Sequence, residues 1–342
     1  MKKLVEIKGA HLQLFKIFDK ICFHKFVTGG ERINLSYFDG NSVQVIEPGL
    51  FYSGLQVGNS YVWQPLNGKG VKVWDKNFNL IHEEDWEIYF ATLKQFFEDK
   101  FIAVRVEDGN KRTYIFSEDL SSQKTVDYLM VAKGGENLIT VKPDYTGAEA
   151  YGIKDADLNW KVDVSVFESP KRFDKHGRDR GANKVDATSG PCGTASNVFL
   201  PLKYGQLLAL NAADGSLIWS KDYMGSYNCF DNRLYYLNGP ELYEIDIETG
   251  NTIQVIEFRK HITKTGLQMI HPFKVYDDVI LLHGSQSTVV LMDRKKFEII
   301  DWFQPNGWES TTIASNRSVF HWWNNCVYVV DMNEVLHIYA LE

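Results

Sequence analysis

The residues in this sequence most able to do chemistry form one acidic cluster: His82, Glu83, Glu84 and Asp85, followed by Glu87. Carboxylate oxygens in this number could bind a divalent cation such as Ca²⁺. Consecutive side chains on an extended chain point in different directions, however, so the cluster does not imply convergence on one ion. It follows directly after a predicted hairpin, where we expect a solvated, charged loop.

The histidines and cysteines do not form the sets that catalysis or metal binding requires. The nine His occur singly, without HxH or HExxH spacing, and we expect His321 and His337 to pack or to form hydrogen bonds. Cys22, Cys192, Cys229 and Cys326 include no CxxC pair, which predicts reduced, mostly buried thiols. No GxSxG, Walker or GxGxxG motif is present. We therefore predict no catalytic, cofactor-binding or metal-binding residues. A pair of carboxylates with glycosidase chemistry, formed by residues distant in sequence, stays an open alternative.

A basic segment is the first candidate for recognition. Residues 168–192, here called the insertion, read ESPKRFDKHGRDRGANKVDATSGPC. Against four acidic residues the insertion carries six basic ones, Lys171, Arg172, Lys175, Arg178, Arg180 and Lys184, so its net charge is +2 in a chain of net charge -7. A long loop of this kind is either a solvated excursion or functional. As a functional loop, its arginine side chains would pair with carboxylates of an acidic partner.

The aromatic C-terminal stretch offers a second possible contact. Trp308 follows Pro305, Asn306 and Gly307, which places it in a predicted loop between strands. Tryptophan is a favoured anchor at protein interfaces as well as a core residue. We expect the other tryptophans of this stretch, which include Trp302 and Trp322, to pack in the interior.

The elements that position these residues come from an internal repeat. Segments such as LALNAADGSLIWSKD at 208–222 and LYEIDIETGNTIQVIEF at 242–258 each place two alternating runs around a short turn, which is a hairpin signal. The anchor positions of the repeated segments fall near residues 37, 75, 117, 155, 211, 246, 293 and 340. Another strand-like run precedes several hairpins, so each repeat of about 40 to 45 residues contains about four strands, the size of a propeller blade. The insertion stretches one spacing to 56 residues. Residues 88–97 could form either a helical turn or a strand pair.

The repeat predicts an all-β fold, a single β-propeller domain over residues 1–342 with eight blades favoured over seven. The chain ends in a strand, LHIYALE, with no outer strand after it, and it begins with the strand-like LVEI. We therefore expect residues 3–8 to supply the outermost strand of the last blade, which would leave no exposed edge there. Trp160 and Trp219 are expected to pack as wedges between blades.

The AADGSLIW segment at 212–219 resembles the repeat of quinoprotein-like propellers, in which Asp-Gly or Thr-Gly turns precede a Trp that docks between blades. Trp74 and Asp75 resemble the dipeptide of WD40-like propellers. The resemblance implies the propeller fold. Quinone-dependent enzymes of the first group use adjacent cysteines, a bound Ca²⁺ and a long chain with a secretion signal. This sequence has no adjacent cysteines, is short for that class and shows no signal. We therefore expect no quinone cofactor.

Composition narrows the function classes further. The aromatic content of 14% supports a large core and excludes a disordered chain, and the net charge of -7 argues against a general binder of nucleic acid or anionic membranes. No transmembrane segment or signal peptide is evident, so we expect a cytoplasmic protein. The leading hypothesis is a non-catalytic protein-binding propeller, either an immunity-type or antitoxin-type inhibitor of a toxin or effector, or an assembly scaffold. The alternative is a propeller enzyme or a binder of a sugar or quinone in the central channel.

Overall fold

A computed structural model gives the structure of the chain. It describes residues 1–26, 33–48, 51–65, 69–87, 94–97, 100–107, 110–117, 119–126, 130–154, 157–167, 181–186, 190–223, 225–262, 269–284, 288–304, 320–331 and 334–341. These residues form eight four-stranded sheets and two short 3-10 helices. In seven of the sheets the strand order follows the order of the chain, so each is a blade of four strands consecutive in sequence.

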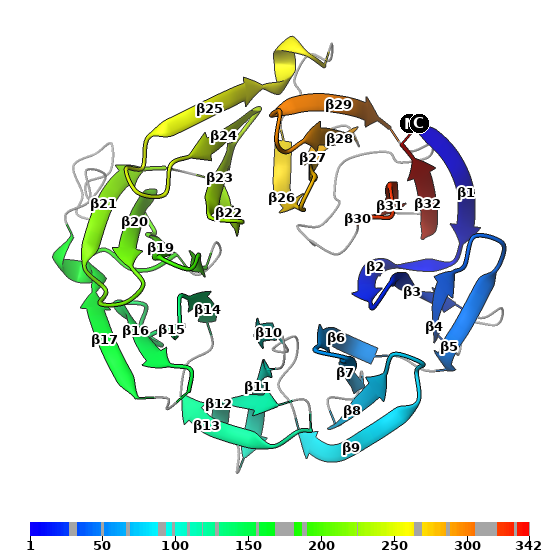
Figure 1. Cartoon of the computed structure of the whole chain (residues 1–342), viewed down its shortest axis with the longest axis horizontal. Coiled ribbons are helices and arrows are strands. Elements are labelled where there is room, and N and C mark those ends of the chain that lie inside the picture. Colours follow the sequence, from blue (N-terminus) through cyan, green and yellow to red (C-terminus); the bar gives the residue numbers. More distant parts are fainter. Residues whose placement is uncertain are drawn as a thin grey trace. The chain divides into compact units, whose positions relative to one another are not determined.

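Figure 1 labels most of the strands. Their sheets belong to two compact units. The first unit comprises residues 1–127, 286–289 and 303–342. Its strands are β1 (Lys2–Lys8), β2 (Ala10–Ile17), β3 (Lys20–Phe26), β4 (Ile33–Phe38), β5 (Val43–Pro48), β6 (Phe51–Val57), β7 (Ser60–Pro65), β8 (Lys69–Asp75), β9 (Leu80–Glu87), β10 (Lys94–Phe97), β11 (Lys100–Glu107), β12 (Asn110–Ser117), β13 (Ser122–Val126), β30 (Phe320–Trp323), β31 (Cys326–Val330) and β32 (Val335–Ala340).

The second unit comprises residues 128–285 and 290–302. Apart from Thr288, Val289 and Phe303, it holds the sheets built from β14 (Met130–Gly134), β15 (Asn137–Val141), β16 (Gly147–Gly152), β17 (Leu158–Asp163), β18 (Cys192–Gly193), β19 (Asn197–Pro201), β20 (Gln206–Asn211), β21 (Leu217–Asp222), β22 (Ser226–Phe230), β23 (Arg233–Asn238), β24 (Glu241–Ile245), β25 (Thr252–Glu257), β26 (Met269–Val275), β27 (Val279–Gly284), β28 (Thr288–Asp293) and β29 (Glu298–Phe303). The 3-10 helices are η1 (Val164–Val166) and η2 (Phe258–Lys260).

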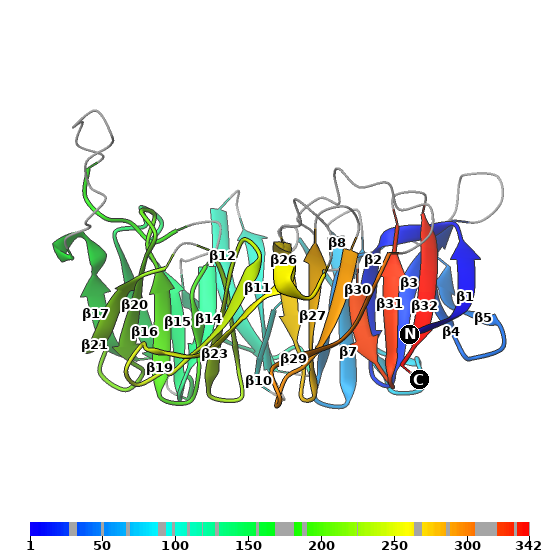
Figure 2. The same ribbon diagram turned by 90° about the horizontal axis from the view of Figure 1, so that it is seen from above.

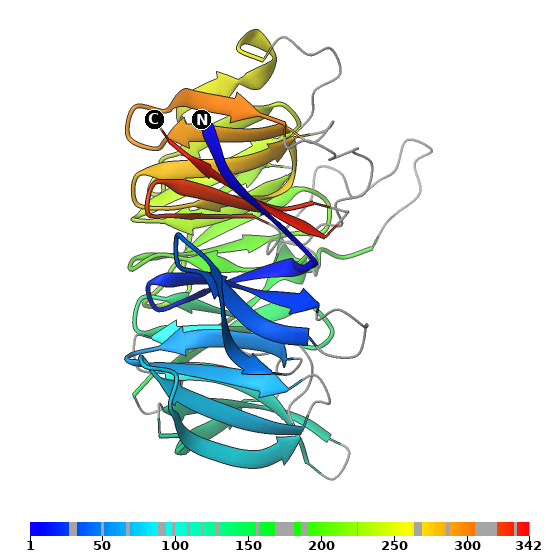
Figure 3. The same cartoon turned by 90° about the vertical axis from the view of Figure 1, so that its right-hand side faces the viewer.

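The two ends of the chain complete one blade together. Its strand order is β1-β32-β31-β30, so the N-terminal strand pairs antiparallel with the C-terminal one, from Lys2 opposite Ala340 to Lys8 opposite Val335. His337 on β32 reinforces the pairing, because its Nε2 lies 2.7 Å from Oδ2 of Asp331 and its Nδ1 lies 3.2 Å from Oε1 of Glu6 on β1. The chain ends lie side by side in Figures 2 and 3. The predicted closing strand is therefore confirmed.

Burial within a blade follows the position of the strand. Second strands such as β19 and β27 are buried along their whole length, because a neighbouring blade covers each face. Outer strands such as β17 and β21 are mostly exposed and bury one large side chain each, Trp160 and Trp219. The apolar clusters consequently lie between successive blades of a unit. One of them joins Phe199 and Leu207 of the blade β18–β21 to Ile245 of the blade β22–β25.

The two tryptophans dock on the next blade in the same way. The indole N–H of Trp160 donates to the Ala212 carbonyl at 3.0 Å, and that of Trp219 donates to the Ile247 carbonyl at 2.9 Å. A side-chain amide donates to each of the same two carbonyls, from Asn137 and Asn197 respectively. The face of each indole lies against a turn glycine of the next blade. The expected role of Trp160 and Trp219 as wedges between blades is confirmed.

The remaining predictions on the fold have mixed outcomes. Eight four-stranded sheets among the described residues agree with the favoured number of blades. Within residues 88–97, which could form a helical turn or a strand pair, Lys94–Phe97 forms strand β10 and the rest lies outside the described residues.

We predict a pH-dependent contribution to stability from His283 on β27. The side chain is only 4% exposed, and burial lowers its pKa from 6.5 to about 4. Because the folded-state pKa is the lower one, the stabilisation is complete above pH 6.5 and is lost as the pH falls toward 4, by up to about 3 kcal/mol. Urea denaturation between pH 7.5 and 4.5 measures the slope. The substitution His283→Leu should flatten it, and an unchanged slope would assign the loss to other groups.

Candidate functional site

The end of the insertion is attached to the blade formed by β18 to β21. Val185 forms a bridge with Leu202, the Asp186 N–H donates to the Pro201 carbonyl at 2.7 Å, and the Lys203 N–H donates to the Lys184 carbonyl at 2.8 Å. The Asn183 side-chain amide, itself buried, donates to the Phe167 carbonyl at 2.7 Å. Residues 181–186, here called the return limb, therefore lie in a fixed position against the turn between β19 and β20.

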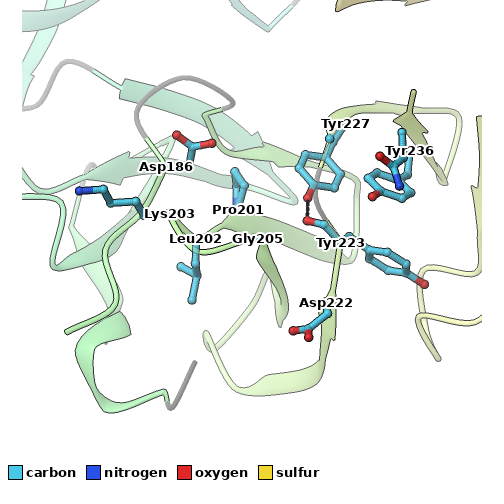
Figure 4. Close-up of a pocket in the computed structure, with 11 residues that line it drawn as sticks. Asp186, Pro201, Leu202, Lys203, Gly205, Asp222, Tyr223, Tyr227 and Tyr236 are labelled. Carbon is cyan, nitrogen blue, oxygen red and sulfur yellow. Dashed lines mark hydrogen bonds between the residues drawn. The ribbon is translucent and has the colours of Figure 1, made fainter. Parts of the chain in front are cut away.

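A cleft of about 590 Å³ lies beside the return limb (Figure 4). Asp186 of the return limb and Lys203 of the β19–β20 turn line one side of it, and Tyr223 and Tyr227 line the other. Asp222, at the end of β21, and the buried Tyr236 on β23 complete the set of side chains considered below. We call this cavity the tyrosine cleft. All of its lining residues belong to the second unit.

The tyrosines of the cleft hold one another in place. The ring of Tyr236 lies between those of Tyr223 and Tyr227, with centroid distances of 4.9 and 5.4 Å. The Tyr227 hydroxyl donates to the Tyr223 carbonyl, and the Tyr223 hydroxyl donates to the Gly250 carbonyl at 2.8 Å. Side chains fixed by packing and hydrogen bonds lose little conformational entropy when a ligand binds. The aromatic wall is thus preorganised.

The electrostatics of the cleft suit recognition better than proton transfer. Burial raises the pKa of Tyr227, with smaller contributions from Tyr236 and Asp186, and burial also raises the pKa of Tyr223. Both phenols are therefore protonated near neutral pH and are poor general bases. Lys203 and Asp222 are exposed at the edges of the cleft, where they can pair with charges of a bound molecule.

The structure describes few of the predicted partner-binding residues. Lys184 lies exposed on the return limb, next to the cleft residue Asp186. The other predicted residues lie outside the described residues: Lys171, Arg172, Lys175, Arg178, Arg180 and Trp308. Trp302 and Trp322 pack as expected, Trp302 against the cluster between β22–β25 and β26–β29 and Trp322 with only 6% exposed.

The prediction of a loop at the acidic cluster is wrong, because the cluster lies on a strand. Residues 82–85 belong to β9, the outer strand of its blade, where Glu83 pairs with Lys72 and Glu84 with Val71. All four side chains are exposed, and the Lys72 ammonium lies 3.7 Å from a Glu83 carboxylate oxygen. Pairing with β8 overrides the turn signal that precedes the cluster. Among the described residues, no group of three or more His, Cys, Asp or Glu side chains could hold a metal ion.

All four cysteines are free thiols, in agreement with the expected reduced state. Cys22 is buried, whereas Cys192, Cys229 and Cys326 are half-buried. The prediction of buried thiols is therefore confirmed for Cys22 and only in part for the other three cysteines. Cys192 and Cys229 lie on the innermost strands of two neighbouring blades, β18 and β22.

The tyrosines of the cleft were not predicted from the sequence, because interface anchors were sought only in the aromatic C-terminal stretch. A signal was present. Tyr223, Tyr227, Tyr235, Tyr236 and Tyr243 fall within one stretch of the chain directly after the most regular repeat. Tyrosine has an apolar ring and a polar tip, and it gathers where one side of a residue packs and the other meets a partner.

Comparison with known proteins establishes the fold alone. No protein-family model and no curated protein sequence matches the chain. Solved structures that are similar include the computationally designed Ika8 protein, with a TM-score of 0.65, 11% identity and complete coverage of both chains. Sqt1 from Saccharomyces cerevisiae is similar at a TM-score of 0.61 and 11% identity, with 99% of each chain covered. BamB from Moraxella catarrhalis is similar at a TM-score of 0.58 and 12% identity, with 99% of this chain and 97% of that chain covered.

The chain is an all-β protein, a β-propeller of four-stranded blades. The resemblance of its repeat to propeller proteins is thus confirmed at the level of fold, without membership of a particular sequence family. In the part of the chain that the structure describes, no helix is long and apolar enough to cross a membrane.

Proposed function

We propose that this chain is a non-catalytic, protein-binding β-propeller whose partner contacts the tyrosine cleft and the return limb together. The observation that carries the proposal is that Asp186 belongs to both: it ends the anchored limb of the insertion and lines the cleft. A charged loop attached beside a preorganised aromatic wall combines the adaptable and the rigid parts of a binding surface.

The chemistry of the cleft supports a protein partner. Tyrosine and arginine are enriched among the residues that dominate binding energy at interfaces, and charged groups at the rim favour one partner over another. Because its pKa is raised, the Tyr227 phenol stays protonated at neutral pH and does not act as a base. The absence of a catalytic function is part of the proposal.

The test uses photocrosslinking in cells of the source organism. A photoreactive residue in place of Lys203, at the cleft, should capture one specific protein. The same residue in place of Lys295 is the matched control, because Lys295 is also an exposed lysine of the second unit but lies in the turn between β28 and β29, away from the cleft. A protein captured equally well at both positions would not be the partner proposed.

Affinity measurements with the captured protein then locate the contact. Lys203→Glu and Asp222→Lys reverse the two exposed charges of the cleft, and each should weaken binding by about tenfold or more, whereas Lys295→Glu should not. Circular dichroism and thermal melts should be unchanged in all three variants, because the substituted charges are at the surface. Wild-type affinity in both cleft variants contradicts this site.

The biological role within this class follows from the identity of the partner. An inhibitor of the immunity or antitoxin type would cover the working surface of a toxin or effector, and the captured protein would lose its activity when bound. An assembly scaffold would instead bind a partner whose activity is unchanged. Measuring the activity of the captured protein with and without an excess of this chain separates the two roles.

A small-ligand binder is the second candidate, and the size of the cleft favours it. A volume of about 590 Å³ falls within the usual range for small-molecule sites. Tyrosine faces and carboxylates are also suited to a sugar, through stacking and hydrogen bonds. A thermal-shift screen with sugars and quinones distinguishes this function, since a ligand would raise Tm in the wild type and not in Asp222→Lys. Binding in a central channel stays a separate prediction.

A further inference from the structure

Cys192 and Cys229 occupy equivalent positions in consecutive blades. Each is the second-last residue of its innermost strand, Cys192 on β18 and Cys229 on β22, and each is followed after one residue by the turn to the next strand. The strands β18 and β22 are in direct contact.

The two side chains meet at that interface. Both thiols pack against the same apolar cluster, which includes Phe199, Leu207 and Tyr236. The Cys229 thiol is hydrogen-bonded to Cys192, and this contact adds to burial in raising the pKa of Cys229. The other two cysteines pack in different apolar clusters, Cys22 with Leu35 and Cys326 with Leu336.

We propose that Cys192 and Cys229 are a redox-active pair that forms a disulfide between the two blades by exchange with a small disulfide such as oxidised glutathione. One cysteine thiolate attacks the small disulfide, forms a mixed disulfide and releases one small thiol. The second cysteine thiolate then attacks the protein sulfur of the mixed disulfide and releases the other small thiol. The two protein thiols are oxidised, their two protons leave, and one small disulfide is reduced to two small thiols.

The short length of β18 gives the bond a structural consequence. With two residues, β18 pairs with β19 only through Cys192 and Gly193, so few ladder hydrogen bonds hold it. A covalent link to β22 would fix the position where the insertion rejoins the blade. The side chains of Cys229 and Tyr227 point to the same face of β22, being two residues apart, so the link would lie next to the aromatic wall of the tyrosine cleft.

Burial sets the rate of the reaction. The thiolate is the reactive form, and the raised pKa of Cys229 keeps it scarce at neutral pH. Exchange is therefore expected to be slow at pH 7 and to accelerate as the pH rises to 8.5.

The experiment treats the purified full chain with oxidised glutathione at pH 7 and pH 8.5 and maps tryptic peptides without reduction. The expected product is one cross-linked pair of peptides containing Cys192 and Cys229, with a loss of two free thiols and a rise in Tm of at least about 3 °C. Dithiothreitol should reverse both changes. Cys326→Ala is the matched control, a half-buried cysteine outside the interface, and it should behave as the wild type.

The variants make the result decisive. Cys192→Ala and Cys229→Ala should each abolish the cross-link and the rise in Tm, and serine replaces alanine wherever a variant fails to fold. The proposal is overturned if a glutathione adduct persists on one of the two cysteines, if both stay reduced, or if the cross-link forms only in denaturant. The measurement needs no binding partner, so its failure leaves the proposed function untouched.

Discussion

Deletion of residues 1–8 is expected to lower the free energy of unfolding by at least about 3 kcal/mol. The deletion removes β1, and with it the antiparallel partner of β32 along its whole length. It also removes Ile7, which is 6% exposed and packs with Leu14, Phe23 and Leu336 in the cluster between the last and first blades of the chain. Loss of one buried Ile alone costs about 2 to 5 kcal/mol, before the lost ladder is counted.

The measurement is urea denaturation followed by circular dichroism. Leu4→Ala is the matched control, because Leu4 lies on the same strand but is 53% exposed, and it should change stability by less than about 0.5 kcal/mol. The exposed edge of β32 should also promote association of the truncated protein. A synthetic peptide of residues 1–8 should restore part of the lost stability by binding that edge. A truncated chain that melts like the wild type would show that the strand is dispensable.

The substitution Trp219→Ala should lower the free energy of unfolding by about 3 to 5 kcal/mol, the usual cost of removing a large buried aromatic side chain. The indole is 7% exposed, it packs beside Phe199, and its N–H donates to the Ile247 carbonyl of the next blade. Trp219→Phe keeps much of the apolar contact and loses the hydrogen bond, so its cost should be smaller. Trp160→Ala should resemble Trp219→Ala, because the two side chains dock alike.

The glycine beneath the indole provides an independent test of the same contact. A Cβ on Gly250 would lie 2.7 Å from the Trp219 ring, whereas a Cβ on Gly239 would meet nothing within 4 Å. Both glycines have positive φ, +68° and +56°, so alanine strains the backbone similarly at each. Gly250→Ala should therefore be the more destabilising of the two by about 1 to 3 kcal/mol. Equal losses of stability in the two variants would mean that the Trp219 indole does not pack against the turn at Gly250.

The fold was largely predictable because the same hairpin pattern recurs in many segments of the sequence. The hairpin around Asp214 and Gly215, the spacing of the turns and the unpaired terminal strands predicted four-stranded blades and the β1–β32 pairing, and these are found. Local residue types predicted the structure less well where the pairing of strands determines it. The acidic residues 82–85 follow a turn signal yet belong to β9, because this segment pairs antiparallel with β8.

The candidate site was less predictable, for a physical reason. The insertion was recognisable as a break in the repeat, and Lys184 is the one predicted binding residue that lies within the described residues. The cleft itself joins residues from β21, β22, β23 and the return limb, and no spacing along the chain encodes that meeting. The positions of Tyr223 and Tyr236 are set by the packing of their rings, so only a structure brings them together.

The pairing of β1 with β32 has a consequence for the order of events during synthesis. The second unit is almost continuous in sequence, between residues 128 and 302, whereas the first needs both residues 1–127 and 303–342. A ribosome adds residues one at a time, so β1 is made long before its partner β32, and contacts this distant in sequence form slowly. We therefore expect the blades of consecutive strands to form before the blade β1-β32-β31-β30, and β1 to stay unpaired until β32 has been synthesised.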